Sequence, residues 1–95
     1  MAPGCASGEL DAPYLGCFHD RRSHRALSRE VDGADRAEEC RDWCEARGYR
    51  YFGREWRGQC FCGNRHDYDK HGRATGCDCC GEDVGNKKIC VWEAR

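Results

Sequence analysis

Hydrophobic residues occur along this chain in short runs, and stretches rich in Gly, Asp, Arg and Lys separate these runs. Short apolar runs bounded by turn-forming residues are typical of β-strands. Four runs are predicted as strands, at residues 14–18, 49–52, 60–62 and 89–92. The second and third are joined by a segment that begins with Gly53 and ends with Gly58, so we expect them to form an antiparallel hairpin.

One segment has helical rather than strand periodicity. The residues that recur there at intervals of three and four are Cys40, Trp43, Cys44 and Arg47. This spacing places them on one face of a helix, with Trp43 on its buried side. Asp32 or Asp35 can cap the start of this helix, and Gly48 follows directly after its end.

The cysteine spacings connect this helix with the third predicted strand. Cys40 and Cys44 are four residues apart, so on a helix they point the same way and lie about 6 Å apart along the axis. Cys60 and Cys62 are two residues apart, so on a strand they point to the same face and lie about 6.6 Å apart. Because the two spacings match, two parallel disulfides could join the helix to the strand.

The composition agrees with a fold that depends on disulfides. Only seven of the 95 residues are Leu, Ile or Val, whereas ten are Cys, so no large aliphatic core can form. Disulfides persist in oxidising compartments, which predicts a secreted, extracellular or cell-surface protein. The net charge of −1 gives no general attraction to nucleic acid, and no apolar run is long enough to span a membrane. We therefore expect neither nucleic-acid binding nor direct membrane insertion.

The chain divides into a short leader and one domain. Residues 1–12 are predicted to be a leader or linker tethered by Cys5, and residues 13–95 to be the domain. Because no apolar stretch of a signal peptide follows Met1, we interpret Met1 as an artificial start on an excised or processed domain.

Two long segments between the predicted elements are expected to be loops. Residues 19–33 are polar and crowded with basic side chains, namely Arg21, Arg22, His24, Arg25 and Arg29. Residues 63–86 are rich in Gly, Asp, Asn and Lys and contain Cys77, Cys79 and Cys80.

Several motifs together resemble the WSC domain, over nearly the whole stretch from Tyr14 to Trp92. The motifs are Tyr14-Leu-Gly-Cys17-Phe18-x-Asp20, Arg25-Ala-Leu27, Cys40-x3-Cys44, Gly48-Tyr-x-Tyr-Phe-Gly53 and Gly58-Gln-Cys60-Phe-Cys62-Gly-Asn64. The resemblance implies a small disulfide-rich α+β fold of PAN or apple-like character, with one helix packed on a short antiparallel sheet and long loops. It also implies noncovalent binding of a polysaccharide such as β-glucan, xylan or a related wall or matrix glycan.

The resemblance bears on the disulfides as well. It implies that Cys40 and Cys44 pair with Cys60 and Cys62, and it favours a bond from Cys17 to the region of Cys77, with Cys90 closing a late loop. Spacing alone leaves the partners of six cysteines open, namely Cys5, Cys17, Cys77, Cys79, Cys80 and Cys90. The stretch from Cys77 to Cys90 departs from the common family pattern, and Cys5 lies outside the family block.

Exposed aromatic rings are the sequence-level candidates for sugar binding. The apolar face of a pyranose stacks on a flat ring, while polar groups at the rim bind its hydroxyl groups. Trp56 is the first candidate because charged residues flank it in the predicted hairpin tip, and Tyr68 in the next loop is the second. The polar rim would come from Arg54, Glu55, Asn64 and Asp67. The alternative is that both rings cover disulfides and arginine stems, and Tyr49, Phe52 and Phe61 are expected in the core.

Metal binding and catalysis are competing interpretations. Cysteine thiolates could bind zinc together with histidines at positions 19, 24, 66 and 71, but the C-x2-C pair of zinc modules is missing. Asp67, Asp69 and Asp78 could bind calcium, but their spacing fits no known calcium loop, and turn-forming aspartates are the better explanation. No nucleophile with a base and no phosphate-binding loop is recognisable. We therefore expect no enzyme, no cofactor and no metal.

The arginine-rich loop keeps a third class of function open. Its charge could attract an acidic polysaccharide or an acidic protein, whereas a solvated loop is the simpler explanation. The sequence thus predicts an extracellular carbohydrate-binding module that targets a larger host protein or assembly to a polysaccharide. The alternative is a protein-interaction or structural module of an extracellular assembly.

Overall fold

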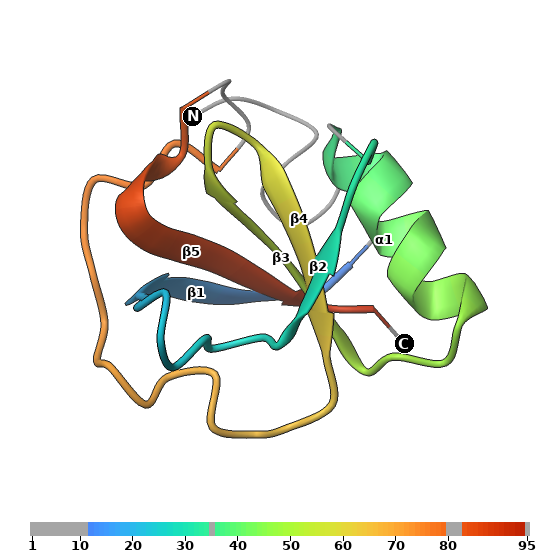
Figure 1. The fold of residues 1–95 in the computed structure, drawn as a ribbon, viewed down its shortest axis with the longest axis horizontal. Coiled ribbons are helices and arrows are strands. Elements are labelled where there is room, and N and C mark those ends of the chain that lie inside the picture. Colours follow the sequence, from blue (N-terminus) through green and yellow to red (C-terminus); the bar gives the residue numbers. More distant parts are fainter. Residues whose placement is uncertain (1–11, 35, 80–82, 95) are drawn as a thin grey trace.

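A computed structural model describes residues 12–34, 36–79 and 83–94 of the chain. Cys5, most of the predicted leader and Cys80 lie outside these residues. The described part consists of one antiparallel sheet and one helix that covers one face of it (Figure 1). Its strands are β1 (Tyr14–His19), β2 (Arg29–Val31), β3 (Tyr51–Trp56), β4 (Gln59–Gly63) and β5 (Gly85–Glu93). The small disulfide-rich α+β fold predicted from the sequence is confirmed.

The strand order β1-β5-β3-β4-β2 places the last strand of the chain inside the sheet, between β1 and β3. The hairpin of β3 and β4 forms as predicted, but β3 continues through the charged residues Arg54 and Glu55 to Trp56. The hairpin tip is consequently Arg57 and Gly58 alone. Strand β5 is also longer than predicted, because it begins at Gly85 within the segment expected to be a loop.

The prediction of one continuous polar loop over residues 19–33 is wrong. Residues Arg29, Glu30 and Val31 form edge strand β2, which pairs with β4. Two of its three side chains are charged and exposed, and only Val31 is buried. Such a strand is defined by its partner rather than by its own hydrophobic pattern.

Helix α1 (Ala37–Ala46) begins two residues after the later of the two predicted capping positions. Its N-cap is Arg36, whose backbone N–H donates to Glu39 Oε1 at 3.1 Å, so Asp32 does not cap the helix. Asp35 lies outside the described residues. Trp43 is half-buried at the margin of the helix, with the Arg47 guanidinium 3.8 Å from its ring centroid.

Two parallel disulfides join the helix to β4, in the arrangement that the cysteine spacings indicated. They are Cys40–Cys60 and Cys44–Cys62. The sulfur atoms of Cys40, Cys44 and Cys60 lie within 4.8 Å of one another because they belong to these bonds, so they do not form a thiolate zinc site. The other two described disulfides are Cys17–Cys77 and Cys79–Cys90.

The sheet separates two hydrophobic clusters, one on each face. The helix face contains the disulfides of α1 and the stacked rings of Phe52 and Trp92, whose centroids are 5.1 Å apart. The opposite face, called the far face below, contains the second cluster: Phe18, Ala26, Leu27, Tyr51, Phe61, Ile89 and Val91. Side chains alternate between faces along a strand, so Arg54 belongs to the helix face and Glu55 to the far face. This alternation separates the two charged residues that the sequence placed together in the hairpin tip.

Candidate functional site

The backbone is distorted where β3 ends beside the start of β5. The strand register shifts between Glu55 and Trp56, and Trp56 has a positive φ of 53°. Lys87, on the adjacent part of β5, has a φ of 58°, and no other non-glycine residue in the described ranges has a positive φ. Such backbone conformations cost on the order of 1–3 kcal/mol each, and they cluster at sites of function. Both strained residues line the same hollow.

Trp56 is exposed as the sequence predicted, with 40% of its surface accessible. Shifts of register re-aim the side chains beside them, which explains why the ring leaves the strand alternation and faces solvent. The Arg57 guanidinium lies 5.1 Å from the ring centroid, so the indole is partly covered by an arginine.

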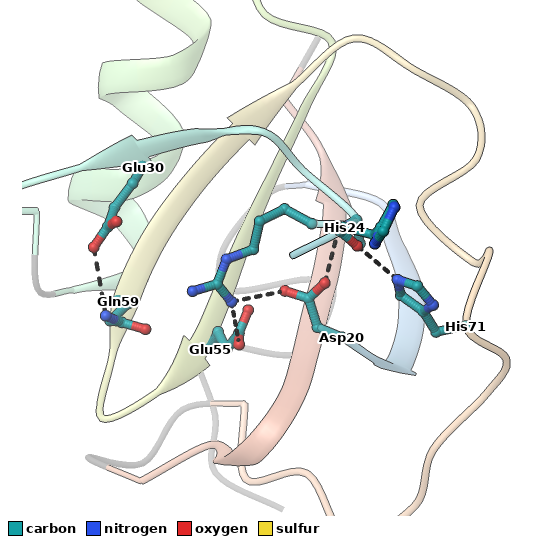
Figure 2. Close-up of polar contacts among 8 residues, drawn as sticks. Asp20, His24, Glu30, Glu55, Gln59 and His71 are labelled. Atoms are coloured by element: carbon teal, nitrogen blue, oxygen red, sulfur yellow. Dashed lines mark hydrogen bonds and ion pairs between the residues drawn. The ribbon is translucent and has the colours of Figure 1, made fainter. Parts of the chain in front are cut away.

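A buried cluster of charged groups lies next to Trp56 on the far face. The Nη1 atom of Arg25 donates to Glu55 Oε2 at 2.7 Å and to Asp20 Oδ2 at 3.2 Å. The backbone N–H of Ala26 donates to the other oxygen of Asp20 at 2.8 Å. Figure 2 shows the carboxyl groups of Asp20 and Glu55 meeting at this guanidinium. One arginine therefore joins the chain after β1 to the end of β3.

The pKa of Glu55 is raised from 4.5 to about 8, chiefly by burial. A hydrogen bond with Asp20 and repulsion by its charge also raise the pKa, and together these effects outweigh the opposing influence of Arg25. The Glu55 side chain is only 5% exposed. Glu55 is accordingly mainly protonated at neutral pH, and it adds little negative charge to the surface above it.

Two adjoining hollows open over this cluster. The smaller, here called the tryptophan hollow, has a volume of about 330 Å³ and is lined by Arg22, Arg25, Glu55, Trp56, Gln59, Asn86 and Lys87. The larger, here called the cationic hollow, has a volume of about 830 Å³ and is lined by His19, Asp20, Arg21, Arg22, Ser23, His71 and Lys87. Arg22 and Lys87 line both, so the two hollows form one continuous surface.

Backbone contacts hold the two sides of the cationic hollow together. A turn closed by the bond from His24 N–H to the Arg21 carbonyl, at 3.1 Å, presents Arg22 at its tip. The Asp20 N–H donates to the Lys87 carbonyl at 2.9 Å, which fixes this turn beside β5. His71 Nε2 donates to the His24 carbonyl at 2.6 Å, because a carbonyl oxygen can only accept (Figure 2). The hollow is thus assembled from three separate segments of the chain.

The six residues predicted to bind sugar do not form one surface. Trp56 and Glu55 line the tryptophan hollow, but Glu55 is a buried member of its floor rather than part of an exposed rim. Arg54 is also buried, at 4% exposure, and donates to the Cys79 carbonyl on the helix face at 2.6 Å. The expected exposed rim of Arg54 and Glu55 is therefore corrected, because both side chains are buried and contact partners inside the protein.

Tyr68, Asn64 and Asp67 lie toward the other end of β3. The Tyr68 ring centroid is 5.1 Å from that of Tyr51, which begins β3, whereas Trp56 ends the same strand about 17 Å away. Tyr68 is half-buried against the far-face cluster. The expectation that this loop lies beside the hairpin tip is wrong, because a strand of this length separates them.

Asn64 and Asp67 have local partners at that end of the sheet. The side-chain oxygen of Asn64 accepts the backbone N–H of Arg50 at 2.8 Å. Asp67 forms ion pairs with Arg65 at 3.4 Å and with Lys70 at 3.8 Å. These contacts stabilise the loop that follows β4.

Sequence reasoning missed several residues of the hollows. Asp20 and Arg25 were noted only as parts of the family motifs and of the basic loop, and Gln59, Asn86 and Lys87 were not singled out. The density of arginines at residues 21–29 was the available signal for the basic side of the surface. No pattern in the sequence indicates that Lys87 meets it, because that proximity arises from the pairing of β1 with β5.

Comparisons with known proteins match most of this chain. A family model described as WSC domain matches residues 14–91. Kremen protein 1 of Xenopus laevis is 36% identical over 67 residues, covering 68% of this chain and 15% of that protein. Human Kremen protein 1 is 30% identical over 67 residues, with 68% and 14% covered. Xylosyltransferase sqv-6 of Caenorhabditis elegans is 36% identical over 53 residues, with 53% and 7% covered. The chain thus spans only a small part of each of these relatives.

Proposed function

This chain belongs to the WSC domain family, and on that premise we propose that it is an extracellular module that binds a polysaccharide without catalysis. The observation that carries the proposal is Trp56, an exposed ring held in a strained conformation at the edge of the tryptophan hollow. An indole offers a flat apolar surface to a pyranose ring, while Gln59 and Asn86 in the same hollow can bind hydroxyl groups.

A noncatalytic role fits the two carboxyl groups of the site. Glycoside hydrolysis commonly uses one carboxyl group as acid and a second as nucleophile or base, about 5 Å or more apart across the scissile bond. Here Asp20 and Glu55 contact the same nitrogen atom of Arg25 and are buried. They are placed to support the fold of the site rather than to flank a substrate.

The relatives support a targeting role within larger proteins. The similar segments occupy between 7% and 15% of proteins that include a xylosyltransferase, by its name an enzyme that acts on sugars. A module that holds its host protein near a glycan suits that setting. One shallow platform binds weakly because it buries little area, so we expect repeated copies or neighbouring domains to increase the avidity. No helix in the described part of the chain is long and apolar enough to cross a membrane.

Replacement of Trp56 tests the proposal. Trp56→Ala should reduce pull-down on insoluble β-glucan and xylan at least tenfold, because the stacking surface is lost. Its free energy of unfolding should change by no more than about 0.5 kcal/mol, because the ring is exposed. The matched control is Tyr14→Ala, which removes an aromatic ring of similar exposure, 38%, from the opposite end of the sheet and should leave binding intact.

A glycan array run beside a screen for protein partners covers the alternative function. Binding to neutral or acidic glycans that requires Trp56 supports a carbohydrate-binding module. A negative array together with a specific extracellular protein partner would replace it with a protein-interaction module.

A further inference from the structure

The cationic hollow is lined by basic side chains that have no acidic partner in the described part of the chain. Arg21, Arg22 and Lys87 form no ion pair with any acidic residue in the described ranges. By contrast, Arg25 contacts two carboxyl groups, and Arg65 and Lys70 share Asp67. Three cations thus border one hollow without described acidic partners.

The acidic residues beneath the hollows offset this charge only in part. Asp20 is buried and is held by Arg25 and the Ala26 N–H. Glu55 is buried and its pKa is raised to about 8, so most of its population is neutral at pH 7. The surface above these groups therefore carries a net positive charge, although the whole chain has a net charge of −1.

The backbone that carries two of these cations is held in place. Arg22 lies at the tip of a turn closed by a backbone hydrogen bond, and Lys87 has the strained conformation that it shares with Trp56. The structure therefore presents a flat apolar ring on one side of the continuous surface and cationic residues on the other.

Resting on the proposed carbohydrate binding, we infer that this surface recognises an acidic polysaccharide, with a sugar ring on Trp56 and a carboxylate or sulfate group at Arg22 and Lys87. Guanidinium groups bind such planar or trigonal oxyanions through paired hydrogen bonds, and an ammonium group adds a point charge. A neutral glycan would use the tryptophan hollow alone. An acidic glycan also uses the cationic hollow, and this difference gives the surface its preference.

The test compares four soluble probes by calorimetry on the whole chain: polygalacturonate for carboxylates, heparin for sulfates, laminarin as a neutral β-glucan, and poly-L-glutamate as an acidic chain without sugar. The double variant R22Q/K87Q should bind the preferred acidic glycan at least tenfold more weakly. Its binding of laminarin should fall by no more than about twofold, because Arg22 and Lys87 also line the tryptophan hollow but a neutral glycan gains nothing from their charge. The matched control R65Q/K70Q removes the same charge at the other end of the sheet and should keep acidic-glycan binding within about twofold. Binding should also weaken as salt rises, because solvent-exposed charges are screened. Comparison of polygalacturonate with heparin identifies which acidic group is preferred.

The outcomes separate this inference from the proposed function. Equal affinity for laminarin and both acidic glycans, with loss of all three in Trp56→Ala, would overturn the acidic preference and leave carbohydrate binding intact. Equal or tighter binding of poly-L-glutamate would overturn it in favour of an acidic protein partner. If R65Q/K70Q weakens acidic-glycan binding as much as R22Q/K87Q does, the acidic preference is overturned in favour of nonspecific charge attraction. The absence of binding to any glycan would overturn both proposals.

Discussion

The two faces of the sheet are held together by different physical means. On the helix face, two disulfides join α1 to β4, and the cysteines involved are fully buried. On the far face no described disulfide ties residues 20–28 to the sheet, and the Arg25 contacts with Asp20 and Glu55 perform that role, with Leu27 packed over Gly63. The disulfides of the helix face do not titrate, whereas the ionic face depends on the protonation of Glu55. Both hollows border the cluster of Asp20, Arg25 and Glu55, so the proposed ligand-binding surface rests on the face that is held by ionic contacts.

The largest expected effect comes from breaking the ionic face. Arg25→Met should lower the free energy of unfolding by about 3 kcal/mol, because it leaves buried Asp20 without its cation and buried Glu55 without its hydrogen-bond donor. Chemical denaturation at pH 7 measures this change, and the same substitution at Arg65, whose side chain is 81% exposed, should cost less than about 0.5 kcal/mol. If both variants lose the same small amount of stability, the far face is held by its apolar contacts alone.

Removal of one disulfide from the helix face should have a smaller effect. The double variant Cys40→Ala/Cys60→Ala should lose about 2 kcal/mol, at the low end for a disulfide. The reason is that Cys44–Cys62 joins the same two elements one turn away, so the unfolded chain gains little additional freedom. Loss of Cys40 alone should be more damaging, because it leaves a buried reactive thiol on Cys60. Thermal melts of the native protein, the double variant and Cys40→Ala without reductant provide the ranking. A double variant that is less stable than Cys40→Ala contradicts it.

The helix face was predictable because its information is local. The i, i+4 spacing of Cys40 and Cys44 and the i, i+2 spacing of Cys60 and Cys62 each depend on one element only. Matching these two distances required no knowledge of the rest of the fold. For the same reason the hairpin and the strand around Cys17 could be located from the sequence.

The far face was not predictable because its contacts join distant segments. Glu55 is charged, so the sequence placed it in an exposed turn, whereas its partner comes from another part of the chain. Arg54 on the helix face was missed for the same reason, because its partner is the distant Cys79 carbonyl. Strand β2 carries two exposed charged residues out of three, so it has no hydrophobic pattern of its own. Exposure of Trp56 was predicted, but its neighbours in the hollow were not. Those neighbours depend on strand pairing across the sheet.

The prediction most specific to the far face is the titration of Glu55. Its pKa is 4.5 when unperturbed and about 8 in the folded protein, so between these values the folded state binds more protons than the unfolded state. The free energy of unfolding should therefore fall as pH rises from about 4.5 to 8, and its contribution is fully present only below that window. Glu55→Gln imitates the protonated side chain at every pH, so it should change stability little below about pH 4.5 and should be more stable than the native protein at pH 7. The decline between about pH 4.5 and 8 should be largely absent in this variant. Denaturation at a series of pH values measures both slopes. The disulfides of the helix face do not titrate, so they add no such pH dependence. Equal slopes for the native protein and Glu55→Gln would assign the decline to groups other than Glu55.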